Sequence, residues 1–588
     1  MRMRSERWDL AAAGFLAVAS VLYVCWRWGI TLGNLSLPFV YMGWDDFETY
    51  VDVTNIRDTG WLWHSARLGA PFGAEFHDFP VIFLHNFDEL LFKAVLVFVP
   101  DVFETVNVVF LLTPVLSCWT SYFVLRELGV SRLAGMGGAL TFAFLPFYFL
   151  RNEFHMMLTL FSFAPLVFWL CVFAYRGMVL QSLRLRSWGW RDWLALVFCV
   201  LIANNGTAYY QAFACFFLLV TALLTAADRH DWRAGLPALR VLGVVLLVFL
   251  LCLLPMVQQN HLQGPNLEPA QRNAVEVDRG GLRLTAMLLP RELPLRWADK
   301  KVDAYHQDAL SDGATYIGPL ASVGVMVLLV VPLFRRKRDD VMGLFGRLGL
   351  AALLLTMVGG LASLGSVFLA PGVLLRVYYR MSLYLAFMGL WLVCAYLDRW
   401  CAGRRYGMAL RVGVAALFAC NLFAQYPHGD ARDYFVPKEV LPSFSPPDFT
   451  RIRAEFTSDR EFVQGLEASL PAGAMIYQLP YHKFPEAGTV ERMYDYQLFT
   501  GFLHSRQLRW SYGGMKGRPG DAWQQEVAKL SVPELVPVLR SVGFAGIYVD
   551  RRAYTEDAFQ GLCTELSVAA GSGPSVSRNG NLVFFSLQ

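Results

Sequence analysis

Long apolar segments recur through the first 425 residues of this chain, and they constrain its fold more than any other feature. A bilayer core about 30 Å thick needs roughly 20 apolar residues for each crossing helix. The segments that fit are 10–31, 104–126, 133–150, 156–175, 193–205, 208–227, 239–257, 315–334, 347–367, 378–397 and 408–426, of which the fifth is short. The sequence therefore predicts a polytopic α-helical membrane protein with about eleven transmembrane helices.

Composition agrees with a lipid environment. The apolar fraction is 55% and only 17% of residues are charged, whereas soluble proteins average about 45–50% and roughly 25%. The net charge of +4 does not suggest a nucleic-acid partner. A P-loop and a GxGxxG turn opening a βαβ unit are both absent from the sequence, so cytosolic nucleotide-sugar chemistry is not supported.

Basic residues alternate from one predicted loop to the next, which predicts the topology. If the N-terminus is cytoplasmic, every cytoplasmic loop is basic, and the run at 335–338 is the clearest case. The positive-inside rule then places 32–103, 258–314 and 427–588 outside the cytoplasm. Charged residues interrupt 81–100, so we interpret it as an interfacial helix. The alternative is a twelfth span, which would invert everything that follows.

The chain changes character after residue 426. Residues 427–450 are rich in proline and charge, and they are followed by a predicted strand at 474–479, a helix at 532–542 and a strand at 546–550. This order predicts a soluble α/β domain. We therefore divide the chain into a transmembrane domain, 1–426, and an extracytoplasmic domain, 427–588.

The first external loop is strongly acidic, with ten carboxylates against three basic residues between positions 43 and 103. It opens with Asp45, Asp46 and Glu48, and on a helix Asp45, Glu48 and Asp52 would share one face. Such a carboxylate could accept a proton from a hydroxyl nucleophile, or hold a divalent cation such as Mg²⁺ or Mn²⁺ against a phosphate. The alternative is a capping box, in which Asp45 and Glu48 only start a helix.

Three further groups of polar residues lie on the predicted outer face. For each group the alternative is an ordinary membrane-surface role, because headgroup contacts and an interfacial aromatic belt use the same residue types. Arg376 and Arg380, four residues apart, would place two guanidiniums on one helix face, as a phosphate site requires. The remaining substrate-binding candidates, in two outer turns and the large external loop, are Arg151, Glu153, His155, Tyr209, Tyr210, Gln211 and Tyr316.

The acidic motif after the first helix, the long first loop and the external C-terminal domain resemble the GT-C superfamily of membrane glycosyltransferases. The tail segments LPAGAMIYQLPY, LHSRQLRWSYGGMKGR and SVGFAGIYVDRRAY are also similar to the YfhO-like bacterial group. The resemblance implies a polyprenyl-phosphate-sugar donor, a glycan or glycolipid acceptor and a bacterial plasma membrane. It assigns the role of base or metal ligand to Asp45 or Asp46, and a second carboxylate role to Glu153.

We therefore expect a glycosyltransferase that moves a sugar from a polyprenyl-phosphate donor to an extracytoplasmic acceptor, with Asp46 slightly favoured over Asp45 as base. One alternative is a translocase for lipid-linked sugars, which would need polar residues at mid-membrane in several helices. Another is a non-catalytic partner in surface-polysaccharide assembly, in which the acidic cluster would be degraded. A cofactor is not required by the sequence, although a divalent cation fits the acidic loop.

Overall fold

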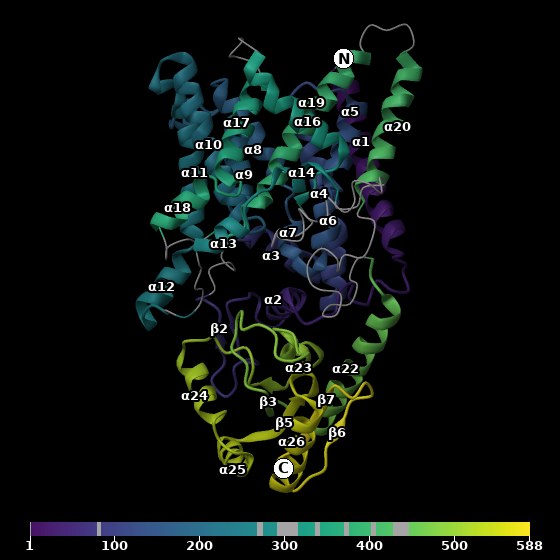
Figure 1. Cartoon of the computed structure of the whole chain (residues 1–588), viewed down its shortest axis with the longest axis vertical. Helices are drawn as coiled ribbons and strands as arrows, with labels where there is room; N and C mark the ends of the chain where they lie inside the picture. Colours follow the sequence, from purple (N-terminus) through teal and green to yellow (C-terminus); the bar gives the residue numbers. More distant parts are fainter. Residues whose placement is uncertain are drawn as a thin grey trace.

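The structure, a computed structural model, describes residues 2–78, 84–266, 268, 274–290, 315–334, 341–369, 375–401, 407–426 and 446–588. Helices fill one end of the elongated molecule and a small sheet with its helices fills the other (Figure 1). The N-terminus lies at the helical end, and the C-terminus lies at the opposite tip.

The helical end is built from segments that match the predicted spans. Its helices are α1 (Arg2–Trp28), α4 (Val102–Glu127), α5 (Arg132–Ala143), α6 (Pro146–Arg151), α7 (Met156–Thr159), α8 (Ala164–Tyr175), α9 (Trp190–Ala203), α10 (Ala208–Arg229), α11 (Leu236–Cys252), α12 (Leu254–Gln263), α16 (Pro319–Phe334), α17 (Val341–Thr356), α18 (Leu361–Leu369), α19 (Ser382–Cys401) and α20 (Gly407–Gln425). Short helices α13 (Ala274–Arg279) and α14 (Leu284–Leu288) and the 3₁₀ turns η2 (Glu153–His155), η3 (Leu185–Ser187), η4 (Trp232–Gly235) and η6 (Tyr378–Met381) connect them.

Within the described residues, eight helical segments are long and apolar enough to cross a membrane. The other three predicted spans fall on the shorter helices α9, α16 and α17. The chain is thus a multi-span helical membrane protein, and the count of eleven stays a prediction.

Several predicted spans are not single helices. The span expected at 347–367 is wrong as one helix, because α17 ends before a glycine pair and α18 begins after it. Gly359 has a φ of 71°, the left-handed conformation that terminates helices. Pro146 and Pro255 lie in the first turns of α6 and α12, where the missing N–H ends the preceding helix.

The described residues of 32–103, which keep the name first external loop from the predicted topology, form the helices α2 (Asp45–Thr59) and α3 (Asn86–Leu96) and a small hairpin of β1 (His64–Ser65) and β2 (Ala74–Glu75). The helix α3 corresponds to the predicted interfacial helix. Its 11 residues reach only about 16 Å, roughly half of a bilayer core. Both α2 and α3 pack against α4, so the loop is held at one end of the bundle.

The C-terminal domain is built around a mixed five-stranded sheet of order β4-β3-β5-β7-β6. The pairs β3–β4 and β3–β5 are parallel, and β7 runs antiparallel to β5 and β6. The predicted strands correspond to β3 (Met475–Leu479) and β5 (Phe544–Asp550), and the predicted helix is α25 (Val532–Val542). The remaining elements are α22 (Phe449–Ser469), η7 (Gln497–Phe499), α23 (Thr500–His504), β4 (Arg509–Trp510), α24 (Pro519–Val527), η8 (Arg551–Ala553), α26 (Glu556–Ala570), β6 (Ser575–Val576) and β7 (Leu582–Ser586).

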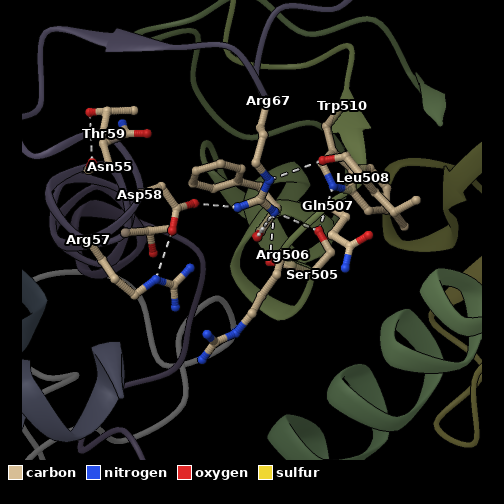
Figure 2. A network of polar contacts seen from close by, with 12 residues as sticks. Asn55, Arg57, Asp58, Thr59, Arg67, Ser505, Arg506, Gln507, Leu508 and Trp510 are labelled. Atoms are coloured by element: carbon tan, nitrogen blue, oxygen red, sulfur yellow. Dashed lines mark hydrogen bonds and ion pairs between the residues drawn. The ribbon is translucent and has the colours of Figure 1, made fainter. Parts of the chain in front are cut away.

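The first external loop and the C-terminal domain are joined by backbone hydrogen bonds. Trp510 N donates to Arg67 O over 2.7 Å, and Ala70 N donates back to Trp510 O over 2.9 Å. Figure 2 shows the Arg67 guanidinium at this junction, where it bonds Asp58 Oδ2 over 2.6 Å and Ser505 O over 2.7 Å. One continuous apolar core runs from the bundle through this junction. The loop is therefore held between the two ends of the molecule.

Candidate active site

Asp46 is held by the backbone that leads into α2. Its carboxylate accepts from Met42 N and Trp44 N, each over 2.8 Å, and from Gly43 N over 3.4 Å. Its side chain is fully buried. Burial raises the pKa of Asp46 to about 6, against these three hydrogen bonds, which lower it. Asp46 therefore shapes the entry to the helix.

Asp45 is the first residue of α2, and Trp44, not Asp45, is the N-cap. The capping box considered for Asp45 and Glu48 is therefore wrong, because the cap makes no side-chain hydrogen bond. The Asp45 side chain is 42% exposed, and its Oδ2 lies 3.4 Å from His155 Nε2. Desolvation by the surrounding protein, then the charges of Asp46 and Glu486, raise its pKa to about 7. A carboxylate with this pKa can exchange protons at neutral pH.

The turn that follows α6 supplies His155 and two other predicted residues. Asn152 has a φ of 35°, and its side chain accepts from Phe154 N over 2.8 Å. With a ψ of −149°, the Asn152 backbone lies outside the left-handed helical region, in a sparsely populated conformation. After this tight turn, the side chains of Arg151, Glu153 and His155 contact three different partners.

Glu153 and Arg151 are both buried, but they differ in what they contact. Glu153 Oε2 accepts from Phe39 N over 3.1 Å and from Tyr50 OH over 3.2 Å. It therefore ties the turn to α2 and to the segment before it. Arg151 instead contacts the hydroxyl of Tyr379, and its charge acts on Asp45 and His155.

The two arginines predicted to share a helix face do not do so. Arg376 precedes the 3₁₀ turn η6, and Arg380 lies inside it, so α-helical spacing does not apply. Arg376 Nη1 pairs with Glu276 over 3.3 Å, and the Arg376 side chain is 42% exposed. Arg380 lies over the ring of Tyr209, 4.3 Å from its centroid, and its charge acts on Arg151. The structure thus brings Arg380, and not Arg376, to the Arg151 and His155 group.

Tyr209 and its neighbours were predicted together. Tyr209 lies under Arg380, and Tyr210 is also near this group, because the charges of Arg380 and Arg151 act on its hydroxyl. Tyr209 OH accepts from Arg376 N over 3.3 Å. Tyr210 OH donates to Leu158 O over 2.6 Å. Gln211 Nε2 donates to the carbonyls of Leu84 and Asn205. Tyr210 and Gln211 therefore both donate hydrogen bonds to backbone carbonyls. Tyr316 is buried at 9% exposure, and among the described residues it has no hydrogen bond or ring contact with the site.

Sequence reasoning missed α3 as part of the site. Asp88 is buried and bonds Asn205 Nδ2 over 2.7 Å. Glu89 is also buried, and its Oε1 lies 3.4 Å from His85 Nδ1. Burial and the charges of Asp52, Asp88 and Glu48 raise the pKa of Glu89 well above its ordinary value. The signal was the Asp88-Glu89 pair inside an apolar segment, which was interpreted only as an interruption.

Acidic side chains therefore extend along α2 toward α3. Burial and the charges of Asp45 and Asp52 raise the pKa of Glu48 well above its ordinary value. Burial raises the pKa of Asp52 to about 7. In the described part of the chain, no three His, Cys, Asp or Glu side chains are grouped closely enough to hold a metal ion.

Comparison with known proteins finds a shared fold. No protein-family model matches the chain, and no curated protein sequence does. ArnT from Cupriavidus metallidurans in the apo state is similar, with a TM-score of 0.54, 14% identity and 98% of each chain covered. ArnT bound to undecaprenyl phosphate gives 0.52, 12% identity and 98% of each chain.

The arabinofuranosyltransferase AftD from mycobacteria aligns with 99% of this chain, which spans only 41% of AftD's length, at a TM-score of 0.49 and 14% identity. At identities this low, likeness shows the fold alone. The chain has the fold of ArnT, a GT-C glycosyltransferase. The narrower YfhO-like resemblance, the domain boundary and the cellular compartment stay predictions.

Proposed function

We propose that the chain is a GT-C type glycosyltransferase that moves a sugar from a polyprenyl-phosphate donor to an extracytoplasmic glycan or lipid-linked acceptor. The observation that carries this proposal is the pairing of Asp45 with His155, beside the charges of Arg151 and Arg380. The ArnT-like fold supports the donor class, because ArnT has been solved with undecaprenyl phosphate bound.

In the proposed reaction, Asp45 is the general base. The acceptor hydroxyl attacks the anomeric carbon of the donor sugar and passes its proton to the Asp45 carboxylate. The bond from that carbon to the phosphate oxygen breaks, and polyprenyl phosphate leaves with the electron pair. Arg380 and Arg151 would stabilise the charge that develops on this phosphate. A pKa of about 7 suits Asp45 to this role, because a base works best with a pKa near the operating pH.

Asp46 and Glu153 are positioning residues in this proposal. Their carboxylates are bonded to backbone and tyrosine groups around Phe39 to Trp44. They thereby fix the start of α2 and the direction of Asp45. This assignment reverses the slight preference for Asp46 as base, since three amide hydrogen bonds occupy its carboxylate.

The decisive experiment replaces Asp45 and Asp46 separately with Asn. The purified protein is given undecaprenyl-phosphate-linked sugars with bacterial glycolipid acceptors, and released undecaprenyl phosphate is measured by mass spectrometry. Asp45→Asn should fold normally and lose about 10²- to 10⁴-fold in rate, the usual contribution of a general base. Asp46→Asn should retain more activity and unfold more easily.

The matched control is Asp557→Asn, which removes an exposed carboxylate from α26 and should change neither property. Full activity of Asp45→Asn would refute the assignment of the base. A wild-type protein that binds undecaprenyl phosphate but releases none from any sugar donor would favour the non-catalytic alternatives.

A further inference from the structure

A pocket of about 150 Å³ lies between the first external loop and the C-terminal domain. Its lining comes from the end of α2, the start of α4, and the helices α22 and α23, and it contains no residue of the candidate active site. The charged and titratable side chains that line it are Arg57, Asp101, Arg460, Glu467, His504 and Arg506. Asp101 and Arg506 are exposed, so the pocket is open to solvent.

The three arginines retain unused hydrogen-bonding capacity. Arg57 Nε donates to Asp58 over 2.8 Å, while Arg57 Nη2 is buried without a hydrogen-bond partner in the described residues. Arg460 lies over the ring of Phe456, 4.7 Å from its centroid. Within the described ranges, neither Arg460 nor Arg506 forms an ion pair. In Figure 2 the Arg506 side chain extends away from the bonded network around Arg67.

The acidic side chains of the pocket are already occupied by backbone groups. Asp101 accepts from Glu104 N over 3.0 Å, as the N-cap of α4. Glu467 Oε1 accepts from Arg506 N over 2.7 Å and from Gln507 N over 2.6 Å. These two carboxylates stay negatively charged, so the pocket lining carries three guanidiniums and two carboxylates, and Arg57 also pairs with Asp58.

His504 does not add a charge. Its Nε2 lies 2.8 Å from Tyr41 OH, and burial, with the nearby charge of Arg460, lowers its pKa to about 3. The imidazole is neutral at physiological pH, where it contributes a polar ring wall. The hydrogen-bond donors that remain without a partner in the pocket therefore belong to positively charged arginines.

We propose that this pocket binds an acidic group, a carboxylate or a phosphate, on the acceptor glycan. Guanidinium groups bind both anions through charge-assisted and often bidentate hydrogen bonds. The inference rests on the proposed glycosyltransferase function. Arg57 follows Asp45 along the same helix α2, at about 18 Å by the α-helical rise. An acceptor that reaches both points is therefore an oligosaccharide or a glycolipid, not a monosaccharide.

The test measures binding to the full chain in phosphatidylcholine nanodiscs by calorimetry. The probes are hexagalacturonate, inorganic phosphate and the neutral maltohexaose. The wild-type protein should bind at least one of the two acidic probes more tightly than maltohexaose. The double variant Arg460→Gln with Arg506→Gln should bind that probe roughly tenfold more weakly or worse, since each charged contact is strong. Higher salt should weaken wild-type binding, because the site is open to solvent.

The control Arg492→Gln removes an exposed arginine elsewhere in the same domain and should leave binding unchanged. Equal binding by the double variant, or an equal loss in the control, would overturn the proposal. Arginine-dependent binding to phosphatidylglycerol vesicles alone would assign the pocket to lipid headgroups instead. Undecaprenyl phosphate release that depends on Asp45 separates the two claims, because it persists if only the acceptor pocket is wrong.

Discussion

Asp45 and Asp46 are neighbours in the sequence with different surroundings. Three backbone amides bind the Asp46 carboxylate, whereas Asp45 faces His155 across 3.4 Å. The charges of Glu486 and Asp495, from the C-terminal domain, also act on Asp45. The pKa of Asp45 therefore depends on residues more than 400 positions away in the sequence.

The pKa of Asp45 predicts how the rate depends on pH. With a pKa of about 7, the base is mostly protonated below neutral pH and becomes competent as pH rises. The rate should therefore increase through pH 7 and level off above it, whereas an ordinary Asp would give a flat profile from about pH 5. Initial rates from pH 5 to 9 measure this.

A shift of that profile provides the control. Asp495→Asn removes one of the charges that raise the pKa of Asp45, so the midpoint should move to lower pH. An unchanged midpoint would mean that a different group controls the rate.

Arg380 and Arg376 should differ in their effect on the donor. Arg380 lies over Tyr209 near Arg151, while Arg376 pairs with Glu276. Arg380→Ala should weaken undecaprenyl phosphate binding by roughly 10- to 100-fold, the range of about 1.5–3 kcal/mol for a charged hydrogen bond. Arg376→Ala is the matched control and should bind almost normally. The opposite ranking in a direct binding assay would restore the sequence-based view of Arg376.

At the scale of elements, α2 links the candidate active site to the C-terminal domain. It carries Asp45 at its start and ends near Arg67, whose guanidinium donates to Asp58 and to three carbonyls of the C-terminal domain. The Arg67 side chain is 13% exposed and lies 4.5 Å from the centroid of the Phe502 ring. Loss of this side chain would leave several polar groups at the junction without partners.

Arg67→Ala should therefore destabilise the protein by about 3 kcal/mol, and Arg67→Lys should recover only part of this, because lysine lacks the planar fork. Thermal unfolding of the purified protein measures the loss, which should appear as a lower melting temperature for Arg67→Ala. The control Arg578→Ala removes a side chain that is 65% exposed and should have almost no effect. Equal melting temperatures for Arg67→Ala and the control would show that the junction is held by its apolar core alone.

At the scale of the molecule, the first basic loop and the C-terminal domain lie at opposite ends. Asp9 near the N-terminus bonds Arg126 and Arg132 in the first basic loop, and the sheet domain occupies the far end of the long axis (Figure 1). This arrangement suits the predicted topology, with the C-terminal domain outside the cytoplasm.

Reporter fusions test that orientation. Alkaline phosphatase, which is active only outside the cytoplasm, should be active after Gln588 and silent after Arg338. A cytoplasm-specific reporter at the same two points should give the inverse pattern. The reverse result for both reporters would invert the topology and make 81–100 a span.

The local properties of the sequence were enough to predict the membrane class, most helix positions and three elements of the C-terminal domain. The lengths of apolar segments, the basic loops and the strand patterns are each properties of neighbouring residues. An apolar segment in a bilayer forms a helix because its backbone polar groups must bond within the segment. The sequence also led to Asp45 and His155 as separate candidates.

The assembly of the site depended on contacts distant in sequence. The loop of α2, the turn at Asn152, η6 and the segment around Asp495 approach one another only in the folded chain. Sequence spacing did not separate Asp45 from Asp46, because the amides that bind Asp46 and the protein that desolvates Asp45 are arranged by packing. The shared helix face predicted for Arg376 and Arg380 was wrong for the same reason, since the chain forms a 3₁₀ turn there and not an α-helix.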